Sequence, residues 1–248
     1  MRRLQKLIEY LFYFFVFLLP WQTRWIWHGG ELNKGFWEYG TFSLYGTDIL
    51  FVVILALAGI YFICKKKIKN QEPNSKFRIT YYILSIVFLV IAFLSVLWAQ
   101  NRGLALYASV KLLESILLFW LVGKMKLSFT KLGIAFVSSA VIQAGLGIWQ
   151  FLTQSTFANK WLGMALQIPG RGGISVIESS VGRWLRAHGS LPHPNMLALW
   201  LVIGLFILLG LAYRFAIQKK SFWKALYPNF WLNIFIYWSC VIIIAGLF

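Results

Sequence analysis

The stretch RWLRAHGSLPHPN, residues 183–195, gathers basic, histidine and amide side chains just before a long apolar run. Arg183 and Arg186 keep their charge at any ordinary pH, and their forked donors match the oxygen atoms of a phosphate. His193 and Asn195 add polar groups next to the predicted start of a helix, whose N-terminus also favours negative charge. The stretch therefore predicts a site for an anion, with phosphate as the best match.

Two interpretations of the arginines stay open. They bind an anion in a cavity, or they only extend toward lipid headgroups. If this piece of chain is helical, the spacing of three residues puts Arg183 and Arg186 on one face. Glu178 precedes Arg183 by five residues, and an ion pair between them would make Arg183 structural and leave Arg186 free. Asn195, directly after Pro194, is expected to cap the following helix.

The two histidines of the stretch also have two interpretations. In the first, His188 and His193 accept or donate a proton near neutral pH, as histidine commonly does in enzymes. Alternatively, both only hydrogen-bond the loop in which they lie. The second interpretation is favoured, because a catalytic histidine usually has a carboxylate partner and none is evident here.

Composition indicates that these residues belong to a membrane protein. The chain has 248 residues, of which 60% are hydrophobic, 19% aromatic and only 12% charged, with a net charge of +17. Soluble domains carry about 25% charged residues. The basic residues are spread over several loops, whereas a nucleic-acid-binding module gathers them on one face. We therefore expect membrane lipid, and no nucleic acid, among the partners.

Seven apolar segments approach the length of about 20 residues that a membrane-spanning helix needs. The sequence predicts an all-α, polytopic fold with about seven transmembrane helices in one domain covering residues 1–248. A loop over residues 153–195, far longer than usual connections, separates the fifth and sixth helices and is expected to be functional. The predicted spans are Leu4–Trp21, Leu44–Cys64, Ile79–Trp98, Leu104–Val122, Leu132–Leu152, Met196–Tyr213 and Trp231–Phe248.

The distribution of lysine and arginine predicts the orientation, because cytoplasmic loops are rich in both. Alternate loops on one side carry most of these residues, so that side is predicted to be cytoplasmic together with the N-terminus, and loop 153–195 to lie outside. The cytoplasmic group is Arg2, Arg3, Lys6, Lys65, Lys66, Lys67, Lys69, Lys76, Arg78, Lys124, Lys126, Lys131, Arg214, Lys219, Lys220 and Lys224. The outer group is Arg24, Lys34, Arg102, Lys160, Arg171, Arg183 and Arg186.

Polar residues inside the predicted spans need an explanation of their own. Lys111 and Glu114 lie three residues apart in the fourth span, and ionisable groups at such positions usually serve function. The alternative is a mutual pair that serves packing, and both interpretations stay open. Gln143 and Gln150 share one face of the fifth span and are expected to bond a neighbouring helix rather than a ligand.

The segment RAHGSLPHPNMLA resembles the motif of the O-antigen ligase and polymerase superfamily, in which an arginine, a glycine and a Pro-Asn pair precede a membrane helix. Here these residues are Arg186, Gly189, Pro194 and Asn195. The segments IQAGLGIWQFLTQS, residues 142–155, and FLLPWQTRWIW near the start are also similar to that family. The resemblance runs from about Leu11 to Trp200.

This resemblance implies a metal-independent glycosyltransferase or ligase with a glycosyltransferase-C-like architecture in the bacterial inner membrane. Such enzymes take a glycan from an undecaprenyl-diphosphate carrier and pass it to lipid A core, a growing polymer or another surface acceptor. Arg186 would hold the diphosphate, and Arg183, His193, Asn195, Gly189 and Arg102 would assist. The catalytic histidine of the family is expected beyond Phe248, in a longer protein of which this chain is the N-terminal part.

The arginines of this stretch suit such a transfer reaction, and the reaction is expected to need no metal or other cofactor. Transfer from a lipid diphosphate builds negative charge on the leaving group, and positioned arginines can stabilise it. The only aspartate is Asp48, so an Asp-rich metal motif is absent from the sequence. The alternative function is a non-enzymatic transporter or flippase for a lipid-linked anion, with Lys111 and Glu114 along its path. Transporters usually carry several polar residues in their spans and two related halves, which this sequence lacks.

Overall fold

The computed structural model describes residues 1–66, 76–180, 182–218, 238–239, 241–243 and 246, and the chain divides into two compact units. The first unit contains Met1–Glu9, Trp25–Leu44 and Phe51–Leu127, and the second contains Tyr10–Arg24, Tyr45–Leu50 and Ser128–Phe248.

The described residues are mostly helical, as the composition predicts. Four of the helices are long and apolar enough to cross a membrane, so the chain is a membrane protein. They coincide with the second, fourth, fifth and sixth predicted spans. These helices are α2 (Gly46–Lys66), α4 (Arg102–Lys124), α5 (Phe129–Thr153) and α6 (Pro194–Gln218).

The other predicted spans are shorter or lie outside the described residues. Helix α1 (Arg2–Leu18) has 17 residues and rises only about 25 Å at 1.5 Å per residue, below the hydrocarbon thickness of about 30 Å. It ends two residues before Pro20, which cannot continue it. Helix α3 (Lys76–Ser95) contributes an apolar stretch over Thr80–Ser95. Most of the predicted seventh span, and the basic residues 67, 69, 219, 220 and 224, lie outside the described residues.

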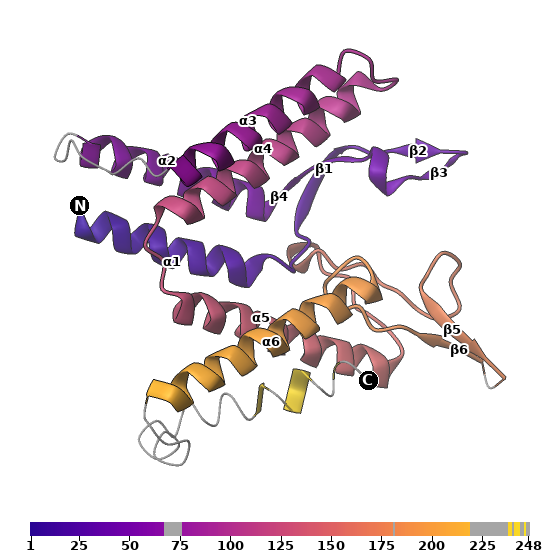
Figure 1. The fold of residues 1–248 in the computed structure, drawn as a ribbon. Helices are drawn as coiled ribbons and strands as arrows, with labels where there is room; N and C mark the ends of the chain where they lie inside the picture. Colours follow the sequence, from indigo (N-terminus) through magenta and orange to yellow (C-terminus); the bar gives the residue numbers. More distant parts are fainter. Residues whose placement is uncertain (67–75, 181, 219–237, 240, 244–245, 247–248) are drawn as a thin grey trace. The chain divides into compact units, whose positions relative to one another are not determined.

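In the first unit, α3 and α4 lie side by side as a helical hairpin (Figure 1). The side chain of Asn101 begins α4 by accepting a hydrogen bond from the backbone N–H of Leu104 at 3.0 Å. The hydroxyl of Ser109 on α4 donates to the carbonyl of Ala92 on α3 at 3.1 Å. Small polar side chains of this kind join helices where no water is present.

Short strands connect α1 to α2. Strand β1 (Arg24–His28) pairs with β4 (Phe42–Tyr45), and β2 (Glu31–Leu32) pairs with β3 (Gly35–Phe36). Asn33 and Lys34 both have positive φ, of 52° and 64°, which is the conformation of a two-residue type I′ hairpin turn. A 3-10 turn, η1 (Glu38–Gly40), precedes β4.

In the second unit, α5 packs against α6 (Figure 1) through a stripe of small residues. Ala140 and Ala144 of α5 are fully buried in one core with Leu201 and Leu208 of α6. A methyl group added at Gly133 would lie 3.1 Å from Ile207, so the glycine allows the helices to approach closely. Packing of small residues is the usual way in which membrane helices associate.

The long loop between α5 and α6 contains a β-hairpin and not the helix that the sequence left open. After the 3-10 turn η2 (Lys160–Leu162), strand β5 (Val176–Ser179) pairs in antiparallel register with β6 (Gly182–Leu185). Branched Val176 and Ile177 favour a strand, and the φ of +134° at Gly182 suits only glycine. The condition under which Arg183 and Arg186 would share one helix face is therefore not met.

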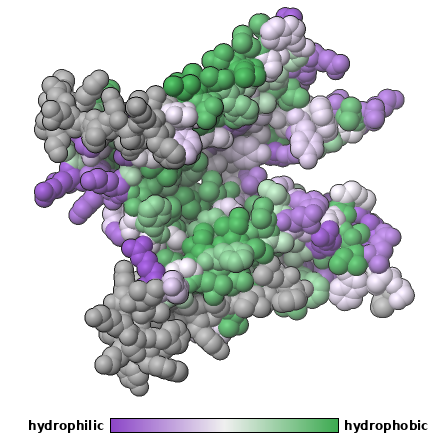
Figure 2. All heavy atoms as spheres, viewed as in Figure 1, coloured by the Kyte–Doolittle hydropathy of each residue, from purple (hydrophilic) through white to green (hydrophobic). Residues whose placement is uncertain are grey.

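Hydrophobic side chains cover the visible flanks of the helices, whereas hydrophilic ones gather at helix ends and hairpins (Figure 2). Several large side chains of α2 and α3 are exposed, among them Ile63 at 66% and Phe88 at 59%. A soluble monomer rarely exposes apolar patches of this extent. This surface is consistent with helices that face lipid.

Candidate functional site

The candidate site is the segment from Arg186 to Asn195, which joins β6 to α6 within the second unit. Its entry is fixed by backbone bonds: the N–H of Arg186 donates to the carbonyl of Ser175 at 3.1 Å. The N–H of Leu185 donates to the side-chain oxygen of Gln154, just after α5, at 2.7 Å. The segment thus leaves the hairpin in a defined direction.

Gln150 of α5 anchors the centre of this segment. Its Oε1 accepts hydrogen bonds from the backbone N–H groups of His188 at 3.0 Å and Gly189 at 2.9 Å. Its Nε2 donates to the carbonyl of Gly189 at 2.7 Å. The side chain is fully buried, so one amide matches three backbone groups that have no contact with water.

Gln143, two turns earlier on α5, anchors the next residue in the same way. Its Nε2 donates to the hydroxyl of Ser190 at 2.7 Å, and its Oε1 accepts from the N–H of Ser190 at 2.8 Å. The Ser190 hydroxyl in turn donates to the carbonyl of Pro20 at 2.9 Å. The segment after α1, the helix α5 and the loop therefore meet at one buried point.

The two glutamines thus bond the loop, whereas the sequence suggested a bond to a neighbouring helix. They are one part of the site for which the sequence indicated the wrong partner. Their spacing of seven residues in an apolar span was a valid signal that one helix face has a polar partner. The sequence could not show that the partner is the backbone of residues 188–190.

Gly189 has a conformation that explains why glycine stands there. Its φ is +61°, and an added Cβ would lie 2.5 Å from Oε1 of Gln143. The site residue implied by the family resemblance therefore shapes the loop by having no side chain.

We expect Gly189→Ala to lower the free energy of unfolding by about 3 kcal/mol, through left-handed strain of about 1–2 kcal/mol and the loss of the Gln143 bond. Gly173→Ala is the matched control, since Gly173 has a φ of +77° with no atom within 4 Å of the added Cβ. The control substitution is expected to lower the free energy of unfolding only by the left-handed strain of about 1–2 kcal/mol. Denaturant titration in detergent micelles measures both values, and equal losses would rule out the Gln143 contact as a cause.

Arg186 lies at the N-terminus of α6. Its guanidinium donates to Oδ1 of Asn195, in the first turn of the helix, at 3.1 Å. The predicted cap is wrong by two residues: the carbonyl of His193 accepts the first helical bonds, and its Nδ1 accepts from the N–H of Asn195 at 3.2 Å. Pro194 occupies the first helical position, where its fixed φ fits and no N–H is required. Asn195 is thereby free to orient Arg186.

Arg183 forms an ion pair in the hairpin and, in the ranges that the structure describes, no hydrogen bond joins it to Arg186 or Asn195. It lies opposite Glu178 in the hairpin register, and its Nε is 3.4 Å from the Glu178 carboxylate. The ion pair considered from the sequence is therefore present. Among the described residues, no carboxylate pairs with Arg186. Arg186, half-buried and held by a neutral amide, can offer its remaining donors to an anion.

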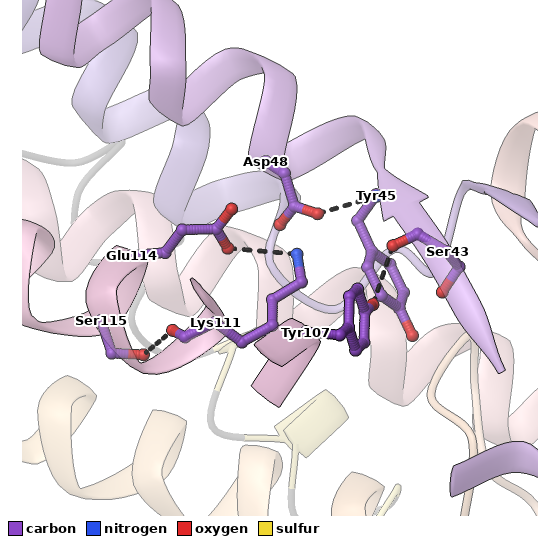
Figure 3. Close-up of polar contacts among 7 residues, drawn as sticks. All are labelled: Ser43, Tyr45, Asp48, Tyr107, Lys111, Glu114 and Ser115. Atoms are coloured by element: carbon purple, nitrogen blue, oxygen red, sulfur yellow. Dashed lines mark hydrogen bonds and ion pairs between the residues drawn. The ribbon is translucent and has the colours of Figure 1, made fainter. Parts of the chain in front are cut away.

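Arg102 and the polar pair of the fourth span belong to the first unit. Arg102 is the first residue of α4. Further along α4, the Lys111 ammonium donates to the Glu114 carboxylate at 3.1 Å (Figure 3), with both side chains little more than a quarter exposed. The hydroxyl of Tyr107 donates to the carbonyl of Ser43 at 2.8 Å. The mutual pair expected as one alternative is therefore formed.

His188 has an unusual environment. It is only 6% exposed, and its Nδ1 lies 2.8 Å from the carbonyl oxygen of Leu191. A carbonyl only accepts hydrogen bonds, so Nδ1 carries the proton and Nε2 has the lone pair. Burial lowers the pKa of His188 below its ordinary value of 6.5; the bond to Leu191 opposes this shift, and the nearby charge of His193 adds to it. His188 is thus a neutral base near pH 7.

The lowered pKa predicts an acid-sensitive loop. Between the folded pKa and 6.5 the unfolded chain binds more protons, so stability falls as pH drops through this window and is constant above it. The slope approaches about 1.4 kcal/mol per pH unit for one group. Unfolding midpoints measured from pH 7.5 to 5 should show the loss in wild type and in His28→Asn but not in His188→Asn. A loss retained in His188→Asn would assign it to another residue.

Searches of protein-family models, curated proteins and solved structures find no match to this chain. The functional conclusion therefore rests on the residues themselves. Among the described residues, no three His, Cys, Asp or Glu side chains are grouped as a metal site requires. The arrangement of Arg186, Asn195 and the start of α6 is suited to bind an anion.

Proposed function

We propose that this chain binds an undecaprenyl-diphosphate-linked glycan at the outer face of the bacterial inner membrane. It takes part in passing the glycan to lipid A core, a growing polymer or another surface acceptor. The proposal includes about seven spans, a glycosyltransferase-C-like architecture, a cytoplasmic N-terminus and membership of the O-antigen ligase superfamily.

One observation carries the proposal: Arg186 is held at the N-terminus of α6 by Asn195, while Glu178 pairs with Arg183 instead. The guanidinium keeps its charge and several donors for a ligand. A diphosphate at this position would also face the partial positive charge of the helix end. As the glycosidic bond breaks, the bond electrons move to the diphosphate oxygen, and both groups would stabilise the developing charge.

The direct test is a binding experiment on the protein reconstituted in lipid nanodiscs. Undecaprenyl diphosphate should bind and should be displaced by increasing salt, whereas undecaprenol, which has no phosphate, should not compete. Addition of a glycan-loaded carrier and lipid A core should then give transfer. Equal binding of undecaprenol and undecaprenyl diphosphate would contradict the proposal.

A second candidate function is transport of a lipid-linked anion without catalysis. The Lys111–Glu114 pair in α4 favours it, because charged residues within a span often line a path for ions or substrates. The two charges neutralise each other, so the pair can also serve only to stabilise the packing of α4. Movement of a fluorescent lipid diphosphate across liposomes, without glycan transfer, would support transport over ligation.

A further inference from the structure

The β5–β6 hairpin has one polar face and one apolar face. Its register pairs Ile177 with Trp184 and Glu178 with Arg183. Because successive residues of a strand point to opposite faces, the two pairs lie on opposite sides of the hairpin. The Glu178–Arg183 ion pair makes one side polar, whereas Ile177 and Trp184 on the other side are 59% and 43% exposed. The hairpin therefore presents an apolar side that the described residues of the second unit leave exposed.

The apolar side of the hairpin continues onto the end of α5. The ring of Trp184 stacks on the ring of Phe151, with centroids 6.3 Å apart and planes at 29°. Phe151 is itself 50% exposed. We call Ile177, Trp184 and Phe151 together the hairpin patch. It is continuous with a helix that is long and apolar enough to cross a membrane, and this continuity indicates what covers it.

The position of Phe151 along α5 sets the level of the hairpin patch in the bilayer. Helix α5 has 25 residues and is therefore about 37 Å long at 1.5 Å per residue, which exceeds the hydrocarbon thickness of about 30 Å. A helix of this length that crosses upright extends about 4 Å beyond the hydrocarbon at each end. Phe151 stands two residues before the last residue of α5, Thr153, so it lies close to the edge of the hydrocarbon. Trp184 stacks on it and lies at a similar level.

Three features of the hairpin match the boundary between lipid headgroups and acyl chains. Tryptophan is enriched at this level, because its ring is apolar and its N–H is polar. Within the described ranges each strand pairs only with the other, so backbone groups on the outer edges need water or headgroups and cannot enter the hydrocarbon. The Glu178–Arg183 pair likewise needs polar surroundings. The boundary of a bilayer offers apolar contact to one side of the hairpin and water to the other.

We propose that the hairpin patch docks onto the bilayer at the boundary of headgroups and acyl chains beside α5. The inference does not rest on the proposed function, because such an anchor serves any membrane protein. Its consequence concerns Arg186, which directly follows β6 and whose N–H donates to the carbonyl of Ser175. An anchored hairpin would hold the backbone of Arg186 near the level of the lipid phosphates.

The test measures the level of single residues in the bilayer with nitroxide spin labels. Both natural cysteines, Cys64 and Cys240, are replaced by serine, and one new cysteine is introduced by Ile177→Cys, Glu178→Cys or Leu152→Cys. Each labelled protein is reconstituted in nanodiscs of phosphatidylcholine and phosphatidylglycerol. Collision of the label with oxygen, which concentrates in lipid, is then compared with its collision with a nickel chelate, which stays in water.

The labels at positions 177 and 178 are the matched pair, because they are chemically identical, adjacent and on opposite faces. We expect the label at 177 to collide mainly with oxygen and to lie within about 5–8 Å of the hydrocarbon edge, the thickness of the headgroup layer. The label at 152, at the exposed end of α5, should give a similar value. The label at 178 should collide mainly with the nickel chelate.

Three results would overturn the proposal. Labels at 177 and 178 that both favour the nickel chelate would place the whole hairpin in water. A label at 177 that neither reagent reaches would show that protein, from this chain or from a second copy, covers the patch. Labels that both favour oxygen would show that the hairpin has no side facing water.

A second variant tests whether Trp184 seats the hairpin. Trp184→Ser removes the stack on Phe151 and leaves the label at 177 in place. We expect that label to shift toward collision with the nickel chelate, while the label at 152 on α5 is unchanged. A label at 177 that does not shift, or that shifts together with the label at 152, would overturn the assignment of Trp184 to the anchor.

Discussion

Replacement of Arg186 by alanine is expected to reduce glycan transfer by about 10² to 10³, the usual effect of removing one charge-stabilising donor. The physical reason is that the guanidinium would stabilise the diphosphate more as negative charge builds on it. Insertion into the membrane should be unaffected, because Arg186 is half-buried at a helix end and, within the described part of the chain, its side chain bonds Asn195 alone. Transfer is measured with the reconstituted protein, and insertion by the amount recovered in the membrane fraction.

Arg183→Ala is the matched control, since it removes the same side chain three residues away. Its partner is Glu178, and the two side chains are 39% and 76% exposed. Exposed ion pairs of this kind contribute about 0–1 kcal/mol, so transfer should stay within about fivefold of wild type. Arg186→Lys should be intermediate, because lysine keeps the charge but loses the forked donors. Equal loss in Arg183→Ala and Arg186→Ala would show that general positive charge, and not a diphosphate site, is required.

The membrane spans could be predicted because they depend on composition alone. Helices α2, α4, α5 and α6 follow uninterrupted apolar runs, and no tertiary contact is needed to locate them. The same reasoning overestimated α1, because the apolar run continues through Pro20 whereas the helix ends at Leu18. Apolar length predicts where a helix lies more securely than where it stops.

The loop was harder to predict, since its conformation depends on contacts between distant residues. The spacing of Arg183 and Arg186 is compatible with a helix. However, the branched residues Val176 and Ile177 and the positive φ of Gly182 favour a hairpin. The pair Glu178–Arg183 was correctly considered because charge complementarity is visible in the sequence. The capping role of His193 was missed, because asparagine is the commoner cap and stands only two residues away.

The buried glutamines carry the largest expected effect on stability. Gln150→Leu keeps the size of the side chain but leaves the N–H groups of His188 and Gly189, and the carbonyl of Gly189, without partners. Each unmatched buried group costs about 1–3 kcal/mol, and partial relaxation of the loop sets the total at about 3–5 kcal/mol. Denaturant titration in mixed micelles measures this loss. Gln5→Leu, which removes half-exposed bonds to Glu9 and Tyr61, should cost less than about 1 kcal/mol.

A double-mutant cycle tests whether the two glutamines act on one structural unit. Gln143→Leu alone should also destabilise the chain, because it frees the N–H and hydroxyl of Ser190. Once Gln150→Leu has released the neighbouring residues, the loop can leave α5, and the second substitution removes a bond that is already weakened. The double variant should therefore lose at least about 1 kcal/mol less than the two single losses combined. Strict additivity would mean that residues 188–190 are not held as one segment, and that the orientation of His188 does not depend on Gln143.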